Sequence, residues 1–252
     1  MTTSALQLRG LRAGYAGRSV LHGLDLDVAC GEWLALVGPN GSGKSTLLDC
    51  ASGRHLPSAG SVHIAGFDLA ADVQAAKQRL GYCVAPERLP QLLTGRQCLA
   101  VHAAAKQLPG VESELLDLAA GLGLSRLLDD PVAIYSYGTR QKIGVLLSLI
   151  ADPALVVLDE AFNGLDAASA IVLKRHLRAR VEAKRCAIVF ATHALDIVER
   201  WTDRALLLQE GRFVGSWDRA ALTALRRDGA DGLEAALAAA GTAYVGENFP
   251  DA

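Results

Sequence analysis

Short apolar runs alternate with polar turns along much of the chain, and their spacing predicts strands and helices. Residues 21–29, LHGLDLDVA, place Leu24, Leu26 and Val28 around two aspartates, which is the period-two pattern of a half-buried strand. Residues 32–38, EWLALVG, are almost continuously apolar, as expected of a strand buried on both faces. Further short strands are predicted at 61–66 and 80–85, and a helix at 44–53.

The period of the pattern changes in the middle of the chain. From about 94 to 150 the apolar side chains recur mostly at helical spacing, which predicts a helical segment. Apolar strands then return, separated by helical stretches, at 154–159, 186–192 and 204–211. This order predicts an α/β fold, a mainly parallel core interrupted by a helical insert. A final helix is predicted at 231–241, with a loose tail at 247–252.

Composition and charge exclude several classes of protein. Of the 252 residues, 51% are hydrophobic and 21% charged, which is ordinary for a globular chain. The net charge of -2 gives no field that attracts nucleic acid, so no nucleic-acid partner is expected. The five cysteines form no disulfide framework or zinc spacing, which indicates reduced thiols. The N-terminus lacks the pattern of a signal peptide, and Asp152 and Pro153 break the longest apolar stretch, so no membrane span is expected.

Residues 38–46, GPNGSGKST, match the phosphate-binding pattern G-x-x-x-x-G-K-[ST] between a predicted strand and a predicted helix. The glycines allow a tight turn whose backbone N–H groups can point at phosphate oxygens, and the helix N-terminus adds a positive dipole. Lys44 is expected to reach the β- and γ-phosphates, and Ser45 to hold Mg²⁺. The alternative is a glycine turn with an accidental Lys-Ser pair. The predicted ATP-binding residues here are Gly38, Pro39, Asn40, Gly41, Ser42, Gly43, Lys44, Ser45 and Thr46.

A second acidic motif follows the strand predicted at 154–159. Asp159 ends this strand and can hold Mg²⁺ through water, and Glu160 is placed to act as the general base for the attacking water. The pair could instead be the polar end of a strand entering a loop, but beside a phosphate-binding loop we favour the catalytic interpretation. The sequence therefore predicts a nucleoside triphosphatase.

The segment YSYGTRQ, residues 135–141, precedes the strand that carries Asp159 and begins a predicted helix. With the two preceding motifs, it resembles the LSGGQ signature of the ATPase subunit of ABC transporters. Ser136 and Gly138 match that signature, whereas Tyr137 replaces its first glycine and Thr139 its glutamine. An N-capping serine at the start of an ordinary helix is the alternative interpretation, and both can be true.

Three further residues are similar to motifs of the same family. Asp166, in AFNGLD, matches the D-loop. His193, in ATHALD, matches the switch histidine that contacts the γ-phosphate in this family. We assign His193 a catalytic role, together with Lys44 and Glu160. Tyr15 lies where the family places an aromatic ring against adenine, although loop packing is an alternative. These motifs occur in family order over residues 6 to 217.

The resemblance implies a P-loop NTPase (RecA-like) core with an N-terminal antiparallel β subdomain and a helical insert, all in one ABC ATPase domain. The implied division is a core lobe at about 1–93 and 151–217, a helical subdomain at about 94–150 and a C-terminal helical extension and tail at about 218–252. It also implies the cofactors ATP and Mg²⁺, and a head-to-tail dimer, expected to be a homodimer. In that dimer the residues Ser136 to Thr139 complete the site of the opposing subunit.

One part of the family pattern is not kept. The family places a glutamine after the strand that contains Gly81 and Tyr82, and this position falls on Ala85, with Glu87 nearby. We therefore expect no standard metal ligand there, and slow or partner-dependent hydrolysis. The segment can still contact a membrane partner, although an exposed proline-rich turn is an equal alternative.

The motor subunit of a bacterial exporter of drugs, antibiotics or peptides is the function that these features favour. A separate transmembrane permease would then be the partner, and the chain would be cytoplasmic and peripheral on the inner face of the cell membrane. The alternatives are a non-transport ABC ATPase that acts on nucleic acid or the ribosome, and a metabolic kinase. Neither a long coiled-coil insert nor an acceptor pocket is recognisable, which disfavours both.

Overall fold

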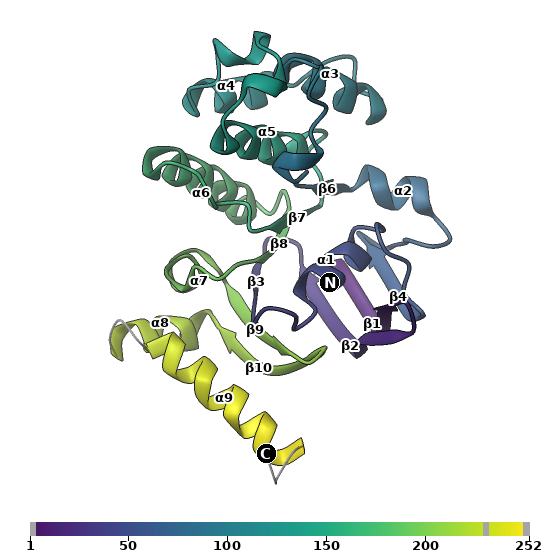
Figure 1. Ribbon diagram of the computed structural model, residues 1–252, viewed down its shortest axis with the longest axis vertical. Coiled ribbons are helices and arrows are strands. Elements are labelled where there is room, and N and C mark those ends of the chain that lie inside the picture. Colours follow the sequence, from purple (N-terminus) through teal and green to yellow (C-terminus); the bar gives the residue numbers. More distant parts are fainter. Residues whose placement is uncertain (1–3, 229–231, 249–252) are drawn as a thin grey trace.

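The computed structural model describes residues 4–228 and 232–248, which form two sheets and their covering helices (Figure 1). The smaller sheet is antiparallel in the order β2-β1-β4-β5, and the larger has the order β10-β9-β3-β8-β7-β6. All pairs in the larger sheet are parallel except β9 with β10. The strands are β1 Ser4–Tyr15, β2 Arg18–Ala29, β3 Trp33–Val37, β4 Ala59–Ile64, β5 Phe67–Asp68, β6 Leu80–Tyr82, β7 Leu155–Asp159, β8 Ala187–Ala191, β9 Arg204–Gln209 and β10 Arg212–Asp218.

The helices pack on both faces of the larger sheet and around its ends. They are α1 Lys44–Ala51, α2 Val73–Gln78, α3 Gly95–Ala105, α4 Ser113–Gly121, α5 Tyr137–Leu149, α6 Ala167–Glu182, α7 Leu195–Trp201, α8 Arg219–Asp228 and α9 Gly232–Asn248. Three short 3₁₀ turns join them, η1 Pro86–Arg88, η2 Leu127–Asp129 and η3 Val132–Ile134. Within the described ranges no helix combines the length and hydropathy needed to cross a bilayer.

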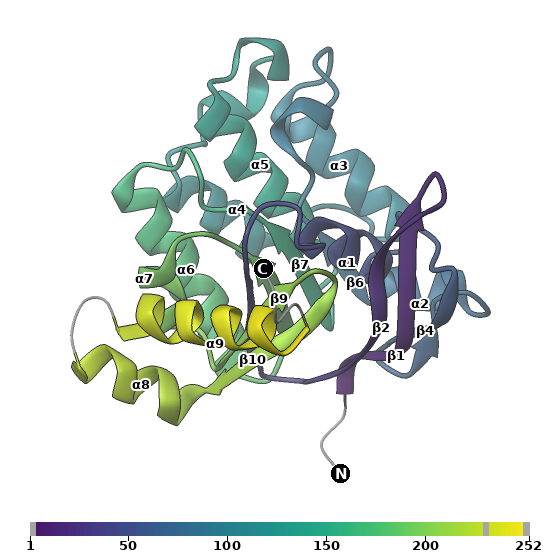
Figure 2. The same ribbon diagram turned by 60° about the horizontal axis from the view of Figure 1, so that its bottom comes forward.

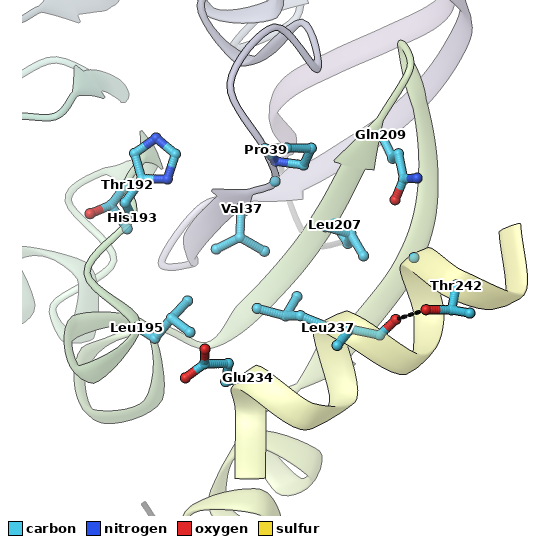
Figure 3. A pocket seen from close by; sticks show the side chains of 13 residues that line it. Val37, Pro39, Thr192, His193, Leu195, Leu207, Gln209, Glu234, Leu237 and Thr242 are labelled. Atoms are coloured by element: carbon cyan, nitrogen blue, oxygen red, sulfur yellow. Dashed lines mark hydrogen bonds between the residues drawn. The ribbon is translucent and has the colours of Figure 1, made fainter. Parts of the chain in front are cut away.

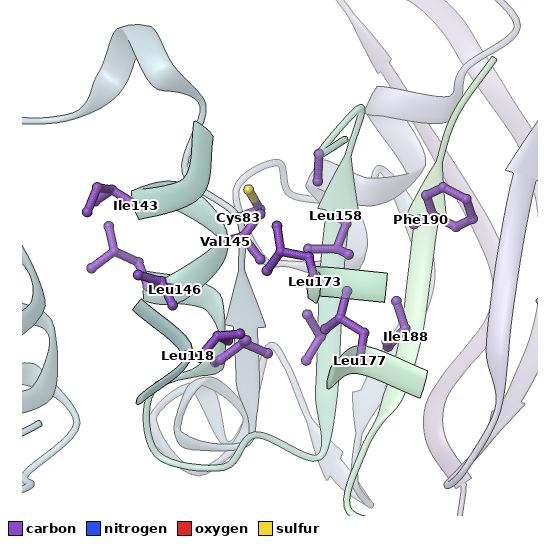
Figure 4. Packing of buried hydrophobic residues seen from close by; sticks show 14 of the residues in the cluster. Cys83, Leu118, Ile143, Val145, Leu146, Leu158, Leu173, Leu177, Ile188 and Phe190 are labelled. Atoms are coloured by element: carbon purple, nitrogen blue, oxygen red, sulfur yellow. The ribbon is translucent and has the colours of Figure 1, made fainter. Parts of the chain in front are cut away.

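The central strand β3 is buried on both faces, as its apolar run predicts, and divides the core in two. Trp33 and Val37 belong to a cluster with helices α5 and α6, whereas Leu34 and Leu36 pack toward α1 and the antiparallel sheet. Figure 4 shows the first cluster, where side chains of α5 and α6 meet those of β7 and β8. Burying strands on both faces is typical of a parallel sheet covered by helices, so the predicted fold class is confirmed.

The chain between β6 and β7 is helical, as predicted, and its helices gather at one end of the molecule (Figure 1). Helix α3 begins with a capping box. The Thr94 hydroxyl accepts from the Gln97 backbone N–H, and the Gln97 side chain accepts from the Thr94 N–H. Such reciprocal bonds satisfy two amide groups that a helix start would leave unpaired.

Three strands were not expected from the hydrophobic pattern. They are β1, which pairs with both β2 and β4, β5, which pairs with β4, and β10, which forms a hairpin with β9. The C-terminus also differs from the prediction. The final helix extends beyond 231–241 to Asn248, so Glu247 and Asn248 are helical and not part of a loose tail. The rest of the predicted tail lies outside the described residues. Figure 2 shows α8 and α9 lying against the β10 side of the sheet.

Candidate nucleotide-binding site

Residues 38–43 connect β3 to α1, and their glycines adopt positive φ angles. At Gly38 φ is 148°, and an added Cβ would lie 2.1 Å from the Leu208 carbonyl oxygen. At Gly43 φ is 108°, and a Cβ would lie 2.9 Å from a methyl group of Leu21. Both positions therefore need glycine for steric as well as conformational reasons. The result is a tight turn that ends at the N-terminus of α1.

The ammonium group of Lys44 lies inside this turn. Its Nζ donates to the carbonyl oxygens of Gly38 at 2.7 Å and Pro39 at 3.0 Å, and the side chain is 8% exposed. Burial lowers the pKa of Lys44, while the carboxylates of Glu160 and Asp159 oppose that shift. The partly desolvated ammonium, which stands in a turn of backbone amides, is well placed to attract phosphate.

Backbone hydrogen bonds hold the loop to two other parts of the fold. The Gly211 N–H donates to the Ser42 carbonyl at 3.0 Å, and the His22 N–H donates to the Gly211 carbonyl at 3.1 Å. An added Cβ at Gly211 would lie 1.8 Å from the Val20 carbonyl oxygen, and its φ is 69°. The β9–β10 turn therefore joins the phosphate-binding loop to strand β2.

Asp159 lies at the carboxyl end of β7, next to the first turn of α1. Burial raises the pKa of Asp159, and the neighbouring Ser45 side chain opposes that rise. A hydroxyl and a carboxylate oxygen are donors that Mg²⁺ accepts, and the ion typically takes only one or two protein ligands in nucleotide sites. The described residues hold no cluster of three or more His, Cys, Asp or Glu. The pair therefore fits the predicted Mg²⁺ site.

Glu160 follows in a strained backbone conformation, with φ of 47°. Its N–H donates to the Ala191 carbonyl at 3.1 Å, which ties it to the neighbouring strand β8. The carboxylate lies 3.6 Å from Nε2 of His193 and accepts a hydrogen bond from the Asn163 amide at 3.2 Å. Burial raises the pKa of Glu160, and His193 opposes the rise. A carboxylate with a raised pKa beside a histidine is suited to accept a proton near neutral pH.

These groups line one open cleft of about 660 Å³. Tyr15, at the end of β1, closes one side of it. The residue is 47% exposed, and its ring packs on that of His55 with centroids 4.4 Å apart. The predicted site residues in the lining are Tyr15, Asn40, Gly41, Gly43, Lys44, Ser45, Thr46, Asp159, Glu160 and His193. The structure thus brings together most of the side chains that the sequence singled out.

Three residues of the loop do not line this cleft. Gly38 and Pro39 face a second cavity of about 610 Å³ between the loop and helix α9, and Ser42 has a buried hydroxyl without a partner within the described residues. Figure 3 shows this second cavity, with Pro39 and His193 on one side and Leu237 of α9 on the other. His193 lines both cavities, so the C-terminal helix packs close to the predicted catalytic residues.

The signature segment lies outside the cleft of its own chain. Ser136 is the N-cap of α5, and its hydroxyl accepts from the Thr139 N–H at 3.1 Å, so the capping alternative is correct. Tyr137 is 50% exposed and its ring covers Gly164, where an added Cβ would lie 2.6 Å from the ring. Gly138 also packs closely on Gly164, since a Cβ at residue 138 would lie 2.4 Å from the Gly164 carbonyl oxygen. The start of α5 is therefore exposed to solvent and packed on the segment that follows Glu160.

Asp166 also stands outside the cleft. It caps α6 by accepting from the Ser169 N–H at 2.8 Å and hydroxyl at 2.7 Å, and it pairs with Lys142 of α5 at 3.0 Å. These partners, Ser169 first, lower the pKa of Asp166. Asp166 therefore connects the helical insert to the core.

Sequence reasoning missed three partners of these residues: Asn163, His55 and Lys142. Asn163 stands three residues after Glu160, and its place inside AFNGLD was the available signal. His55 and Lys142 are 40 and 24 residues away from the groups they contact, and no local pattern indicates such pairings. They became visible only when the fold placed them together.

Comparison with known proteins identifies the class. The family model described as ABC transporter matches residues 21–163, and the chain belongs to this family. The uncharacterized ABC transporter ATP-binding protein YdbJ of Bacillus subtilis is 33% identical over 211 residues, covering 84% of this chain and 68% of YdbJ. The Nod factor export ATP-binding protein I of Mesorhizobium japonicum is 32% identical over 216 residues, and the match covers 84% of this chain and 62% of that protein.

Solved structures agree with this assignment. A structure described as the ATP binding subunit of an ABC transporter superposes with a TM-score of 0.79 at 30% identity, covering 89% of this chain and 92% of that one. A dimeric ATP-binding cassette in a post-hydrolysis state with ADP and Pi shares the fold, with a TM-score of 0.76 at 19% identity, over 85% and 98% of the two chains. The chain is therefore an ATP-binding ABC ATPase with a P-loop NTPase fold.

Proposed function

We propose that this chain is the motor subunit of an ABC exporter, which closes as a homodimer around two ATP molecules and drives a separate membrane permease. The observation that carries the proposal is the convergence of the phosphate-binding loop, Asp159, Glu160 and His193 in one cleft. Tyr15 stands at the rim of this cleft, at a suitable place for an adenine ring.

ATP binding would begin with an exchange of partners at Lys44. Its ammonium now donates to two loop carbonyls, and the phosphate oxygens of ATP would take their place. The N–H groups at the start of α1 and the helix dipole would bind the same phosphates. The lowered pKa of Lys44 then returns toward its usual value, because an added anion stabilises the charged form.

Ser45 and Asp159 would hold Mg²⁺, which neutralises charge on the β- and γ-phosphates. The Ser45 and Asp159 side chains interact, so each can offer an oxygen to the same ion. Burial of Asp159 strengthens its attraction to a cation, since the local dielectric is low.

Glu160 would accept the proton of the attacking water, and His193 would bind the γ-phosphate. The Asn163 amide holds one carboxylate oxygen of Glu160, which leaves the other toward His193. Placing a base beside a bound γ-phosphate converts hydrolysis into a pre-oriented reaction. Further donors to the γ-phosphate would come from a second chain.

We assign those donors to Ser136 and Gly138 of a second copy. Ser136 is exposed and Gly138 is half-buried at the start of α5, and both lie away from the cleft of their own chain, where the ATP of another subunit could reach them. The dimeric cassette with ADP and Pi is the fold relative that supports this arrangement. Tyr137 and Thr139 would frame the same contact, and Asp166 would lie close to it through the packing of Gly138 on Gly164.

Export is supported by the Mesorhizobium relative, whose name describes a Nod factor export ATP-binding protein. The loop at 85–93 offers a contact for a membrane partner, because Leu92 is 94% exposed on it. In this proposal the chain is cytoplasmic and held at the inner face of the membrane by that permease. The second candidate remains a non-transport ABC ATPase that acts on nucleic acid or the ribosome.

The test is the variant Glu160→Gln, with Glu199→Gln as the matched control. Glu199 lies on α7 and does not line the cleft, so its variant should hydrolyse ATP normally. Glu160→Gln should bind ATP, lose turnover by at least about a hundredfold, and elute as a dimer with ATP. Normal hydrolysis by Glu160→Gln would refute the assignment of the base.

The partner is tested with the same variant. Tagged Glu160→Gln is captured with ATP from gently solubilised membranes, and bound proteins are identified by mass spectrometry. A polytopic membrane protein in stoichiometric amount supports the transporter motor. Ribosomes, DNA or soluble proteins alone would replace it with the second candidate.

A further inference from the structure

A positively charged cavity of about 620 Å³ lies between helices α6, α7 and α8, which follow one another along one side of the molecule (Figure 1). It is separate from the nucleotide cleft and shares no lining residue with it. Its lining includes six basic side chains, contributed by all three helices: Lys174, Arg175, Arg178, Arg200, Arg219 and Arg226. Such a gathering stands out in a chain whose formal net charge is -2.

Two of these cations are already engaged. Arg178 pairs with Glu182 at 2.9 Å and with Asp203 at 2.8 Å. Arg219 donates to the carbonyl oxygens of Thr202 at 2.6 Å and Arg200 at 3.4 Å, which fixes the start of α8 beside the end of α7. These contacts set the shape of the cavity and leave its other charges unneutralised.

The remaining four cations have no acidic partner within the described part of the chain: Lys174, Arg175, Arg200 and Arg226. The ammonium of Lys174 lies 5.6 Å from the centre of the Trp201 ring. The described lining of the cavity contains one carboxylate without an ion pair, Asp196, beside these four unpaired cations. Uncompensated like charges repel one another, so holding them together around a cavity favours binding of an anion there.

We propose that this cavity binds a small ligand that carries two or more phosphate groups. Arginine guanidinium groups match the geometry of phosphate oxygens and bind them through paired hydrogen bonds. A phosphate group concentrates nearly two negative charges in a small volume, so two of them balance four cations. The cavity volume lies within the range of small-molecule sites, which favours a small ligand over a protein surface. Trp201 and Ile171 supply an apolar part of the wall.

The position of the cavity gives the ligand a route to influence the ATPase. Helix α6 begins at Ala167, directly after Asp166, and Ala167 lines the cavity. Helix α7 begins two residues after His193. A ligand that binds α6, α7 and α8 together would therefore restrain the segments that carry Asp166 and His193.

The experiment uses inorganic tripolyphosphate and isothermal titration calorimetry. All proteins carry Lys44→Ala, so binding at the phosphate-binding loop does not contribute and failure of the proposed ATPase mechanism leaves the result unaffected. The test variant adds Arg175→Gln and Arg226→Gln. The matched control adds Arg79→Gln and Arg126→Gln, which are exposed, lie outside the cavity and change the net charge equally.

We expect the test variant to bind tripolyphosphate at least tenfold more weakly than its parent, and the control to bind within twofold of it. Equal weakening in both variants, or no binding by the parent, would overturn the proposal. Tighter binding of hexaglutamate than of tripolyphosphate would also overturn it in favour of an acidic protein segment. Vesicles with a doubly phosphorylated headgroup, compared with the free headgroup, distinguish a lipid source from a soluble one, and either supports the phosphate assignment. Circular dichroism melts check that both variants fold.

Discussion

The close packing of α5 on the segment after Glu160 can be tested with a single methyl group. In Gly138→Ala the new Cβ would lie 2.4 Å from the Gly164 carbonyl oxygen, where ordinary contacts require more than 3 Å. The atom it meets belongs to the backbone, so relief requires moving α5 or the loop at 160–166. In Gly121→Ala, the matched control on α4, the Cβ would meet only a methyl group of Val172 at 3.7 Å.

The two substitutions should have opposite effects on the free energy of unfolding. Overpacking of this kind typically costs about 1–3 kcal/mol, and replacing a helical glycine with alanine recovers up to about 1 kcal/mol. We therefore expect Gly138→Ala to lose about 1–2 kcal/mol and Gly121→Ala to gain about 0.5 kcal/mol. For a chain of this size the first corresponds to a fall in Tm of about 2–8 °C.

The assay is thermal unfolding without nucleotide, followed by ATP hydrolysis well below Tm. Gly138→Ala should melt below the parent and Gly121→Ala slightly above it. Turnover should fall in Gly138→Ala, because displacement of α5 also moves Ser136. If Gly138→Ala melts at or above the parent, the contact with Gly164 is not tight and the argument for coupling between α5 and this loop fails.

Two further predictions concern the cleft. Burial raises the pKa of Glu160, and the hydrogen bond from Asn163 opposes that rise. Asn163→Ala should therefore raise this pKa further and move the acidic limb of the pH–rate profile to higher pH. An unchanged limb would argue against Glu160 as the base. Tyr15→Ala should weaken ATP binding about fivefold, because one ring contact is worth about 1 kcal/mol. Tyr15→Phe should bind ATP normally. If calorimetry gives Tyr15→Ala the same affinity for ATP as the parent, Tyr15 only packs on His55.

The parallel core was predictable because its strands carry strong, uninterrupted apolar runs. Strand β1 was not, since its buried positions do not keep one phase. Leu6 and Leu8 are two residues apart, but the next buried leucine is Leu11, and the pairing with β2 shifts register between Leu8 and Leu11. Gly10, with φ of 55°, stands in this irregular stretch. A bulge that breaks the alternation hides a strand from periodicity arguments.

In the site, residues from contiguous motifs were predictable and their partners were not. The nine-residue pattern at 38–46 specifies both the backbone turn made by the loop glycines and the position of Lys44 at the end of that turn. The contacts of Tyr15 with His55 and of Asp166 with Lys142 join separate elements, so they depend on tertiary packing. The C-terminal helix beside His193 is a further case, because its proximity to the cleft follows from the path of the β9–β10 hairpin.

The turn at Gly211 has a consequence for how this chain can vary. Its two hydrogen bonds, to Ser42 and from His22, involve only main-chain atoms, so neither depends on a side chain. Substitutions at 42, and any at 22 except proline, therefore leave the hydrogen bonds between the phosphate-binding loop and strand β2 intact. Residue 211 has no such latitude, since a Cβ would lie 1.8 Å from the Val20 carbonyl. The side chains at 42 and 22 can therefore change during evolution without loss of this contact, provided that residue 211 remains glycine.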